Sequence, residues 1–159
     1  MEKLIFYICT YAVISFTVDA KLGSSTEHYN TCLTENNVSD DDMLTEQDVI
    51  HDRHKESENQ EKIKKNGCVL QCILEKFGMM EGSEYDIEKM RSETIKGDID
   101  ESTKLKLLEG LNNCINETKD LTEKCEKSFD LVVCGLKSKK KVYASRSENQ
   151  EEHEHKSEK

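Results

Sequence analysis

The residues best suited to chemistry in this sequence are its cysteines. A thiol can act as a nucleophile, bind a metal ion or form a disulfide, and the compartment largely decides which. Six cysteines follow an N-terminal apolar segment, with 35, 3, 41, 10 and 8 residues between them: Cys32, Cys68, Cys72, Cys114, Cys125 and Cys134. An even number of cysteines behind an export signal favours disulfides over a metal site or a reduced enzyme.

The N-terminal segment, residues 1–20, predicts a secretory signal peptide. Residues 4–18 are almost wholly apolar, and Val18-Asp19-Ala20 offers small residues at the cleavage positions. The apolar run is too short for a membrane anchor. We predict a secreted, extracellular protein cleaved after Ala20, which removes the seventh cysteine, Cys9. The alternative is a buried N-terminal helix.

The remaining 139 residues suit one domain and carry 22 Lys and Arg against 31 Asp and Glu, a net charge of −9. Such an acidic chain will not attract nucleic acid or an anionic membrane. Tryptophan is absent and aromatic residues are few, so the core must be aliphatic and modest. In the chain-entropy model each disulfide would contribute about 3–4 kcal/mol to the stability of such a core.

The apolar pattern is helical nearly everywhere, and proline is entirely absent. Capping boxes are predicted at Thr45–Asp48 and at Ser83–Asp86, and no segment alternates as a strand would. The fold class is therefore all-α, a compact six-helix bundle. The predicted helices cover about residues 26–36, 45–53, 61–77, 83–96, 102–117 and 122–137.

The last part of the chain has a different composition. Residues 138–159 are almost all polar or charged, and such a segment cannot bury enough apolar surface to become ordered. We expect a folded domain over residues 21–137 and a disordered polar C-terminal tail over residues 138–159.

Helix geometry limits how the cysteines can pair. Cys68 and Cys72 lie one turn apart on one face of a helix, with side chains too nearly parallel to bond to each other. Cys125 and Cys134 lie about two and a half turns apart and face opposite sides of another helix. Excluding these two pairs leaves ten of the fifteen possible connectivities.

The cysteine spacing resembles that of insect odorant-binding and pheromone-binding proteins. Residues 65–76, 85–91 and 113–125 also look like ant pheromone-binding proteins of the general-protein-9 type, and the resemblance covers about residues 21–136. It implies the interlocked disulfides Cys32–Cys72, Cys68–Cys125 and Cys114–Cys134. It also implies a hydrophobic cavity inside six helices, secretion and a homodimer. In some members the C-terminus enters the cavity, but the basic and polar tail here is ill suited to that, or to a pH-driven release based on it.

A carrier of this kind needs an apolar ligand site with a few polar groups. Tyr29, Tyr85 or Tyr143 could offer a hydroxyl to a ligand, although each also fits a plain surface tyrosine. Ordinary core packing is the alternative for each residue that we predict to line the cavity: Met43, Leu70, Leu74, Phe77, Met79, Met80, Leu107, Leu111, Ile115, Phe129, Val132 and Val133.

Histidines and glycosylation signals are the other candidate sites. His51 and His54 could sense pH near a pocket entrance, and His153 and His155 could bind copper or zinc weakly, but no structural metal site is expected. Asn37 and Asn116 each begin a sequon. Lys139-Lys140-Lys141 could be a processing site, although solvated lysines are the commoner explanation.

Catalysis has no support in the sequence. No nucleophile elbow, zinc-protease helix motif or phosphate-binding glycine loop is present, and the disulfides use every cysteine of the secreted chain. We therefore predict no enzyme and no cofactor. The prediction is a secreted carrier of small hydrophobic semiochemicals, odorants or pheromones, active in olfaction or social signalling. The alternative is a venom or defence effector on the same scaffold that acts through its surface.

Overall fold

The computed structural model describes the chain over residues 20–157, with side chains to residue 145. The predicted signal peptide lies outside the described residues except for Ala20. The fold is all-α, as predicted, with six helices over the described range. They are α2 (Tyr29–Glu35), α3 (Glu46–Ile50), α4 (Gln60–Lys76), α5 (Ile87–Thr94), α6 (Glu101–Thr118) and α7 (Lys124–Ser157).

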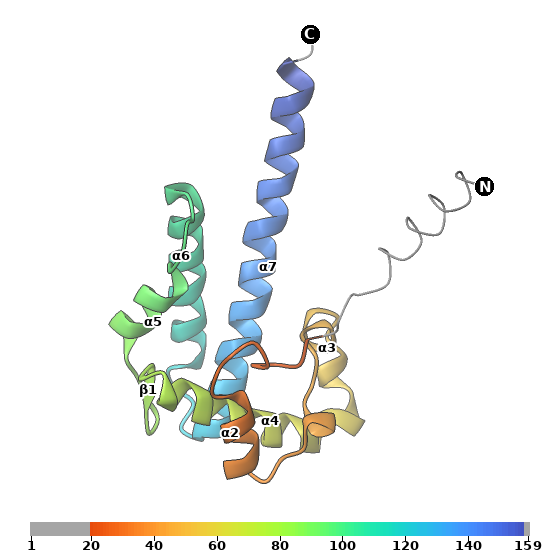
Figure 1. The fold of residues 1–159 in the computed structure, drawn as a ribbon, viewed down its shortest axis with the longest axis vertical. Coiled ribbons are helices and arrows are strands. Elements are labelled where there is room, and N and C mark those ends of the chain that lie inside the picture. Colours follow the sequence, from red (N-terminus) through yellow and green to blue (C-terminus); the bar gives the residue numbers. More distant parts are fainter. Residues whose placement is uncertain (1–19, 158–159) are drawn as a thin grey trace, which may run out of the picture.

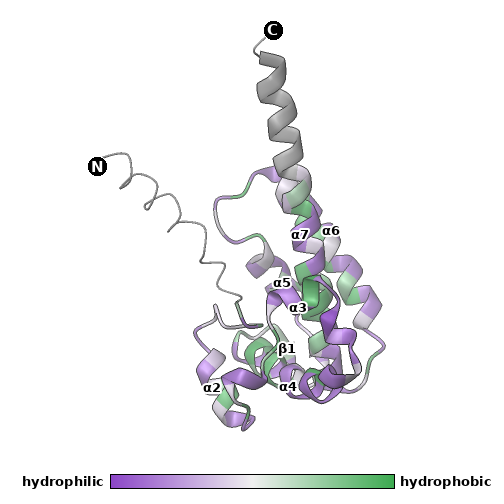
Figure 2. Cartoon of the chain, turned by 90° about the vertical axis from the view of Figure 1, so that its right-hand side faces the viewer, coloured by the Kyte–Doolittle hydropathy of each residue, from purple (hydrophilic) through white to green (hydrophobic). Residues whose placement is uncertain are grey.

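Two long helices organise the bundle. Figure 1 shows α4 lying across the base of the molecule, with α6 and α7 rising from it side by side. Helix α2 packs on α4, α3 packs on α7, and α5 packs on α6. Hydrophobic residues, green in Figure 2, gather where these helices meet, and the outward faces are largely hydrophilic.

The core consists of two clusters of buried residues. The first joins the N-terminal segment, α2 and α3 to α4 and α7, and the second joins α4 and α7 to α5 and α6. The first cluster includes Leu22, Leu33, Met43, Val49, Val69, Leu70 and Phe129. The second includes Leu74, Met80, Met90, Cys114, Ile115 and Leu131.

A buried amide fastens the segment before α3 to α4. Asn66 is completely buried, and its Oδ1 accepts a hydrogen bond of 2.8 Å from the backbone N–H of Leu44. Its Nδ2 donates to the carbonyls of Asp42 and Lys62 at 2.9 and 2.8 Å. Both polar atoms are thus satisfied, so the amide stabilises this contact without the cost of an unpaired buried group.

The predicted start of α3 is confirmed, but that of α5 is wrong. Thr45 and Asp48 form the expected reciprocal capping box at α3. Ser83 does not cap α5; the cap is Asp86, whose carboxylate accepts from the N–H of Lys89.

The residues before α5 instead form a short hairpin, whereas no strand was predicted there. Strands β1 (Met80–Glu81) and β2 (Glu84–Tyr85) pair antiparallel around Gly82 and Ser83. Gly82 has φ of 59°, at the first turn position, where type II′ hairpins place glycine. The residues around the gap between the predicted helices 45–53 and 61–77 contain two 3₁₀ turns, Arg53–Lys55 and Ser57–Asn59. A third 3₁₀ turn, Asp40–Asp42, precedes α3.

Helix α7 is longer than predicted and replaces the expected disordered tail as far as Ser157. No glycine or proline follows Gly135, and Lys, Glu, Gln and Arg have high helix propensity. A helix also satisfies its own backbone hydrogen bonds, so a polar composition does not prevent it. Residue 137, the predicted end of the folded domain, lies inside this helix, and the division of the chain into domains stays a prediction.

The three disulfides implied by the family resemblance are all present: Cys32–Cys72, Cys68–Cys125 and Cys114–Cys134. They connect α2 to α4, α4 to α7, and α7 to α6 in turn. Cys68 and Cys72 do reach different elements, as do Cys125 and Cys134, as the helix geometry required.

Helices α4 and α7 approach each other unusually closely at Gly67. The Cα atoms of the adjacent Cys68 and Cys125 are only 4.4 Å apart. A methyl group added at Gly67 would collide with the backbone carbonyl of Cys125 and lie 3.3 Å from Cβ of Phe129. Only glycine fits this crossing without a shift of backbone.

Gly67→Ala tests this crossing, with Gly135→Ala as a matched control. Both glycines lie inside helices, but a methyl group at Gly135 meets no atom within 4 Å. We expect Gly67→Ala to lower the free energy of unfolding by about 1–3 kcal/mol through overpacking. Gly135→Ala should raise it by about 0.5–1 kcal/mol through helix propensity. Chemical denaturation of the oxidised proteins measures both, and equal effects of the two substitutions would contradict the close crossing.

Candidate ligand-binding site

The structure distributes the predicted cavity-lining residues over both core clusters. Met43, Leu70 and Phe129 are buried in the first cluster, with Phe77, Val132 and Val133 half-buried against it. Leu74, Met80 and Ile115 are buried in the second, with Met79 and Leu111 half-buried against it, and Leu107 is buried on α6. Which of them contact a ligand stays a prediction.

Several of these apolar side chains are incompletely covered. Val132, Val133 and Leu136 form a half-buried row on α7, and Phe77 lies half-buried at the end of α4. Phe77 also packs edge-on against the ring of His28, with centroids 4.9 Å apart. Half-buried apolar surface of this kind is what a hydrophobic ligand can cover on binding.

Hollows on the surface include some of the predicted residues. Met80 lines one of about 640 Å³ next to the hairpin, and Val133 lines a second of about 640 Å³ between α6 and α7. Leu107 and Leu111 line a third, of about 370 Å³, further along the same two helices. These volumes fall within or close to the range of small-molecule sites in proteins.

Two of the three candidate tyrosines already have partners within the protein. The Tyr29 hydroxyl donates to Asp40 at 2.6 Å, and burial together with this carboxylate raises the pKa of Tyr29 strongly. The Tyr85 hydroxyl lies 2.8 Å from Oγ1 of Thr118, and burial raises the pKa of Tyr85 as well. Tyr143 remains 37% exposed and lines the third hollow, which contains Leu107 and Leu111.

A buried lysine, which the sequence did not predict, lies next to Tyr85. Lys127 is only 4% exposed, and its ammonium donates at 3.0 Å to the carbonyl of Lys119, just after the end of α6. The ammonium also lies 4.6 Å from the centroid of the Tyr85 ring. It therefore meets both the negative end of the α6 dipole and an aromatic face, which together offset the loss of water.

His54 and His51 lie in different environments. His54 is buried, with its ring tilted against Phe129, and its Nδ1 is 3.3 Å from the carbonyl of Asp48. It also lines the hollow that contains Val133, whereas His51 is exposed. A role of either in pH sensing stays a prediction. His153 and His155 lie beyond the residues whose side chains are described.

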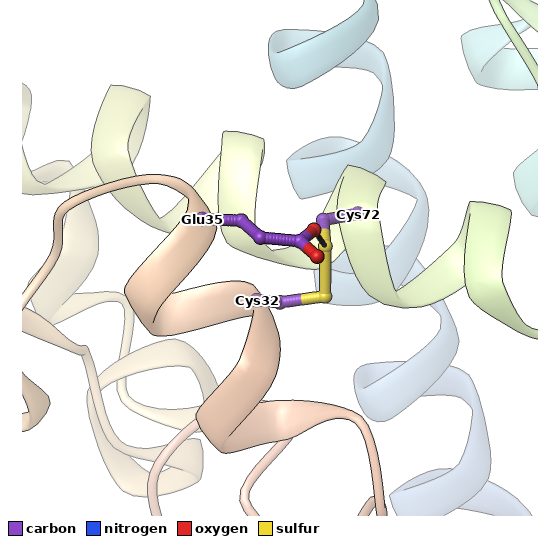
Figure 3. A group of neighbouring side chains, drawn as sticks. All are labelled: Cys32, Glu35 and Cys72. Carbon is purple, nitrogen blue, oxygen red and sulfur yellow. Dashed lines mark hydrogen bonds between the residues drawn. A yellow bond between two sulfur atoms is a disulfide. The ribbon is translucent and has the colours of Figure 1, made fainter.

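One group of side chains has the spacing of a metal site but not its chemistry. Cys32, Glu35 and Cys72 place two sulfurs and a carboxylate together, as Figure 3 shows. The sulfurs are bonded to each other and so cannot act as thiolate ligands. Glu35 lies 3.2 Å from Sγ of Cys72 and pairs with Lys76 at 2.9 Å. Since reduction begins with attack by a thiolate, this carboxylate opposes approach to that sulfur.

Comparison of the sequence with known protein families identifies the group to which the chain belongs. The PBP/GOBP family profile matches residues 15–138. The chain belongs to the PBP/GOBP family.

Relatives within the family include ant proteins. The chain is 43% identical over 147 residues to the pheromone-binding protein Gp-9 of Solenopsis globularia littoralis, covering 86% of this chain and 90% of the relative. It is 42% identical over 147 residues to that of Solenopsis nigella gensterblumi, and 41% over 141 residues to that of Solenopsis interrupta. Those alignments cover 86% of this chain and 92% of each relative. No solved structure matches the chain significantly.

Family membership decides the class of function. The PBP/GOBP proteins are binding proteins rather than enzymes, and membership implies a carrier of small hydrophobic ligands. No helix over the described residues is both long enough and apolar enough to cross a membrane.

The two sequons lie in different backbone conformations, one in a loop and one in a helix. Asn37 is exposed in the loop after α2, with φ of 51°, whereas Asn116 lies inside α6. The hydroxyl of Thr118, the third residue of the second sequon, is buried and bonded to the carbonyl of Cys114 at 2.9 Å. Both asparagines are exposed, so the two sequons differ in their backbone and in the burial of Thr118, and use of either stays a prediction.

Two aspartates near α7 have pKa shifts of opposite sign. The pKa of Asp130 is raised, mainly by desolvation and to a lesser extent by the nearby Glu126, whereas His54 acts in the opposite direction. Hydrogen bonds from Lys137 and Lys55 lower the pKa of Asp52 to about 2, and the bond from Lys137 has the larger effect. Stability therefore falls as the pH rises through the raised pKa of Asp130. The contribution of Asp52 is complete above its ordinary value of 3.8 and disappears as the pH falls through about 2.

We expect Asp130→Asn to raise the melting temperature at pH 7 and Asp52→Asn to lower it. Both differences should shrink on acidification. That of Asp130→Asn should disappear as the pH falls from the raised pKa of Asp130 to the ordinary value of 3.8, and that of Asp52→Asn as the pH falls from 3.8 to about 2. Thermal unfolding monitored by circular dichroism from pH 2 to pH 7 provides the measurement. Shifts of the same sign at pH 7 would show that the environments of the two carboxylates are wrongly assigned.

Proposed function

We propose that this protein is a secreted carrier that takes up small hydrophobic semiochemicals, odorants or pheromones, and transports them through aqueous fluid. The observation that carries the proposal is the family match over residues 15–138, and the three disulfides of the described chain are consistent with it. The printed names of the relatives, pheromone-binding proteins of ants, support semiochemicals as the ligand class. Chemosensory and social behaviour are the settings in which such a carrier would act.

Secretion is supported by the state of the cysteines. All six cysteines after residue 20 are paired, and disulfides persist in oxidising compartments such as extracellular fluid. The net charge of −10 for the whole chain favours solubility at the high concentration that a carrier needs. A homodimer, which the family resemblance implied, belongs to the same proposal.

The mechanism is transfer of apolar surface out of water. A ligand that buries about 250–350 Å² of apolar surface gains roughly 6–9 kcal/mol at about 25 cal/mol per Å². The entropy lost on association and the ordering of side chains offset part of this gain. The expected dissociation constant is therefore about micromolar, which allows both uptake and release.

Displacement of a fluorescent apolar probe from the oxidised protein tests this function. We expect micromolar probe binding, competition by long-chain alcohols and esters, and loss of binding after the disulfides are reduced. Reduction should abolish binding because the walls of the site come from helices that the disulfides hold together. The control is circular dichroism of the same samples. A helical, fully oxidised protein without saturable probe binding would contradict the carrier function.

A further inference from the structure

The groove between α6 and α7 that contains Leu107 and Leu111 combines an apolar floor with a basic edge. Its volume is about 370 Å³, and the end of α5 and the following loop close one side. Leu107 is 7% exposed, and Ile99 and Leu111 are half-buried. Leu107 and Leu111 lie four residues apart and so share one face of α6. The floor is thus a continuous aliphatic surface from two chain segments.

The opposite wall comes from the part of α7 that the sequence predicted to be disordered. Tyr143 lines the groove and remains 37% exposed, and Lys139 lies one turn before it on the same face. A ligand lying on this apolar floor would therefore be close to both the aromatic ring of Tyr143 and the ammonium of Lys139.

The charges around the groove distinguish its two lysines. Lys96 pairs with Glu93 at 3.3 Å, and Glu93 also pairs with Lys89 at 3.3 Å. Hydrogen bonds from these two lysines lower the pKa of Glu93. Lys139 forms no ion pair within the part of the chain whose side chains are described. The lining of the groove therefore carries a surplus positive charge, on a chain whose net charge is −10.

We propose that this groove binds aliphatic carboxylates, with the hydrocarbon chain over Ile99, Leu107 and Leu111 and the carboxylate at Lys139. This inference rests on the proposed carrier function and names one class of ligand and its place. Lys139 is exposed, so its pairing with a carboxylate would be a surface ion pair whose contribution to affinity is modest. A neutral alcohol of the same length would gain the apolar contacts but not this pairing.

Gly135 offers a way to fill the groove without disturbing the fold. It lines the groove, and an added Cβ would meet no atom within 4 Å. Gly135→Leu should therefore place a side chain at the groove while improving the helix propensity of α7.

The test compares decanoate with decanol at pH 7, by calorimetry on the oxidised protein purified from insect cells that express the full chain. We expect decanoate to bind more tightly, and Lys139→Gln to weaken decanoate about fivefold while leaving decanol unchanged. Lys140→Gln is the matched control, because this neighbouring exposed lysine does not line the groove. Gly135→Leu should weaken both ligands without lowering the melting temperature.

The outcomes separate this inference from the carrier function. Equal affinity for decanoate and decanol, or equal effects of Lys139→Gln and Lys140→Gln, would overturn the carboxylate groove. If the wild-type protein still bound the apolar probe in that case, the carrier function would stand. If neither the probe nor either ligand bound, both the function and the groove would fall. Unchanged decanoate binding by a folded Gly135→Leu protein would place the ligand elsewhere.

Discussion

The close crossing of α4 and α7 is the constraint on which the rest of the fold depends. At Gly67 the backbone of one helix rests against the carbonyl of Cys125 in the other, and the next residue carries the disulfide between them. Each of these two helices then holds one further helix by a second disulfide, α2 on α4 and α6 on α7. The order of attachment is thus α2, α4, α7, α6. A shift at the central crossing would move both outer helices relative to each other.

The same crossing also divides the core. Helix α4 directs Val69, Leu70 and Ile73 into one cluster and Leu74 into the other. Helix α7 divides its residues in the same way, with Phe129 on one side and Leu131 on the other. Each cluster is small, which follows from a chain with few aromatic residues and no tryptophan. Covalent links between the helices then supply stability that a single large core would otherwise provide.

The sequence predicts those parts of the fold that depend on local signals. Thr45 caps α3 as its spacing with Asp48 indicates, and Gly78 ends α4 with φ of 66°. The N–H of Gly78 donates to the carbonyl of Glu75, and the N–H of Met79 donates to the carbonyl of Leu74, both at 2.9 Å. These bonds close the last turn of α4. The hairpin had a local signal too, because Gly82-Ser83 is a common two-residue turn, but the capping pattern of Ser83 and Asp86 appeared stronger.

The candidate site could be predicted in part only, because it depends on how helices pack. The apolar period of α6 identifies Leu107 and Leu111, but no local pattern shows that Lys139 and Tyr143 lie opposite them. Their composition instead favoured disorder, since a polar segment gains little from burial. Gly67, Asn66 and Lys127 escaped notice for a similar reason. Gly67 packs against Cys125 and Asn66 bonds to Leu44, both of which are distant in sequence. Lys127 bonds to Lys119, which lies on the other side of the turn between α6 and α7.

A carrier must leave apolar surface available for its ligand, and this requirement opposes stability. Val132, Val133 and Leu136 remain half-buried, so the protein forgoes part of the free energy that their complete burial would provide. Disulfides stabilise the folded chain largely by restricting the unfolded one, and therefore need no additional packing at the site. Cross-links between α2, α4, α6 and α7 thus hold the helices in place although apolar side chains between them are only half-buried.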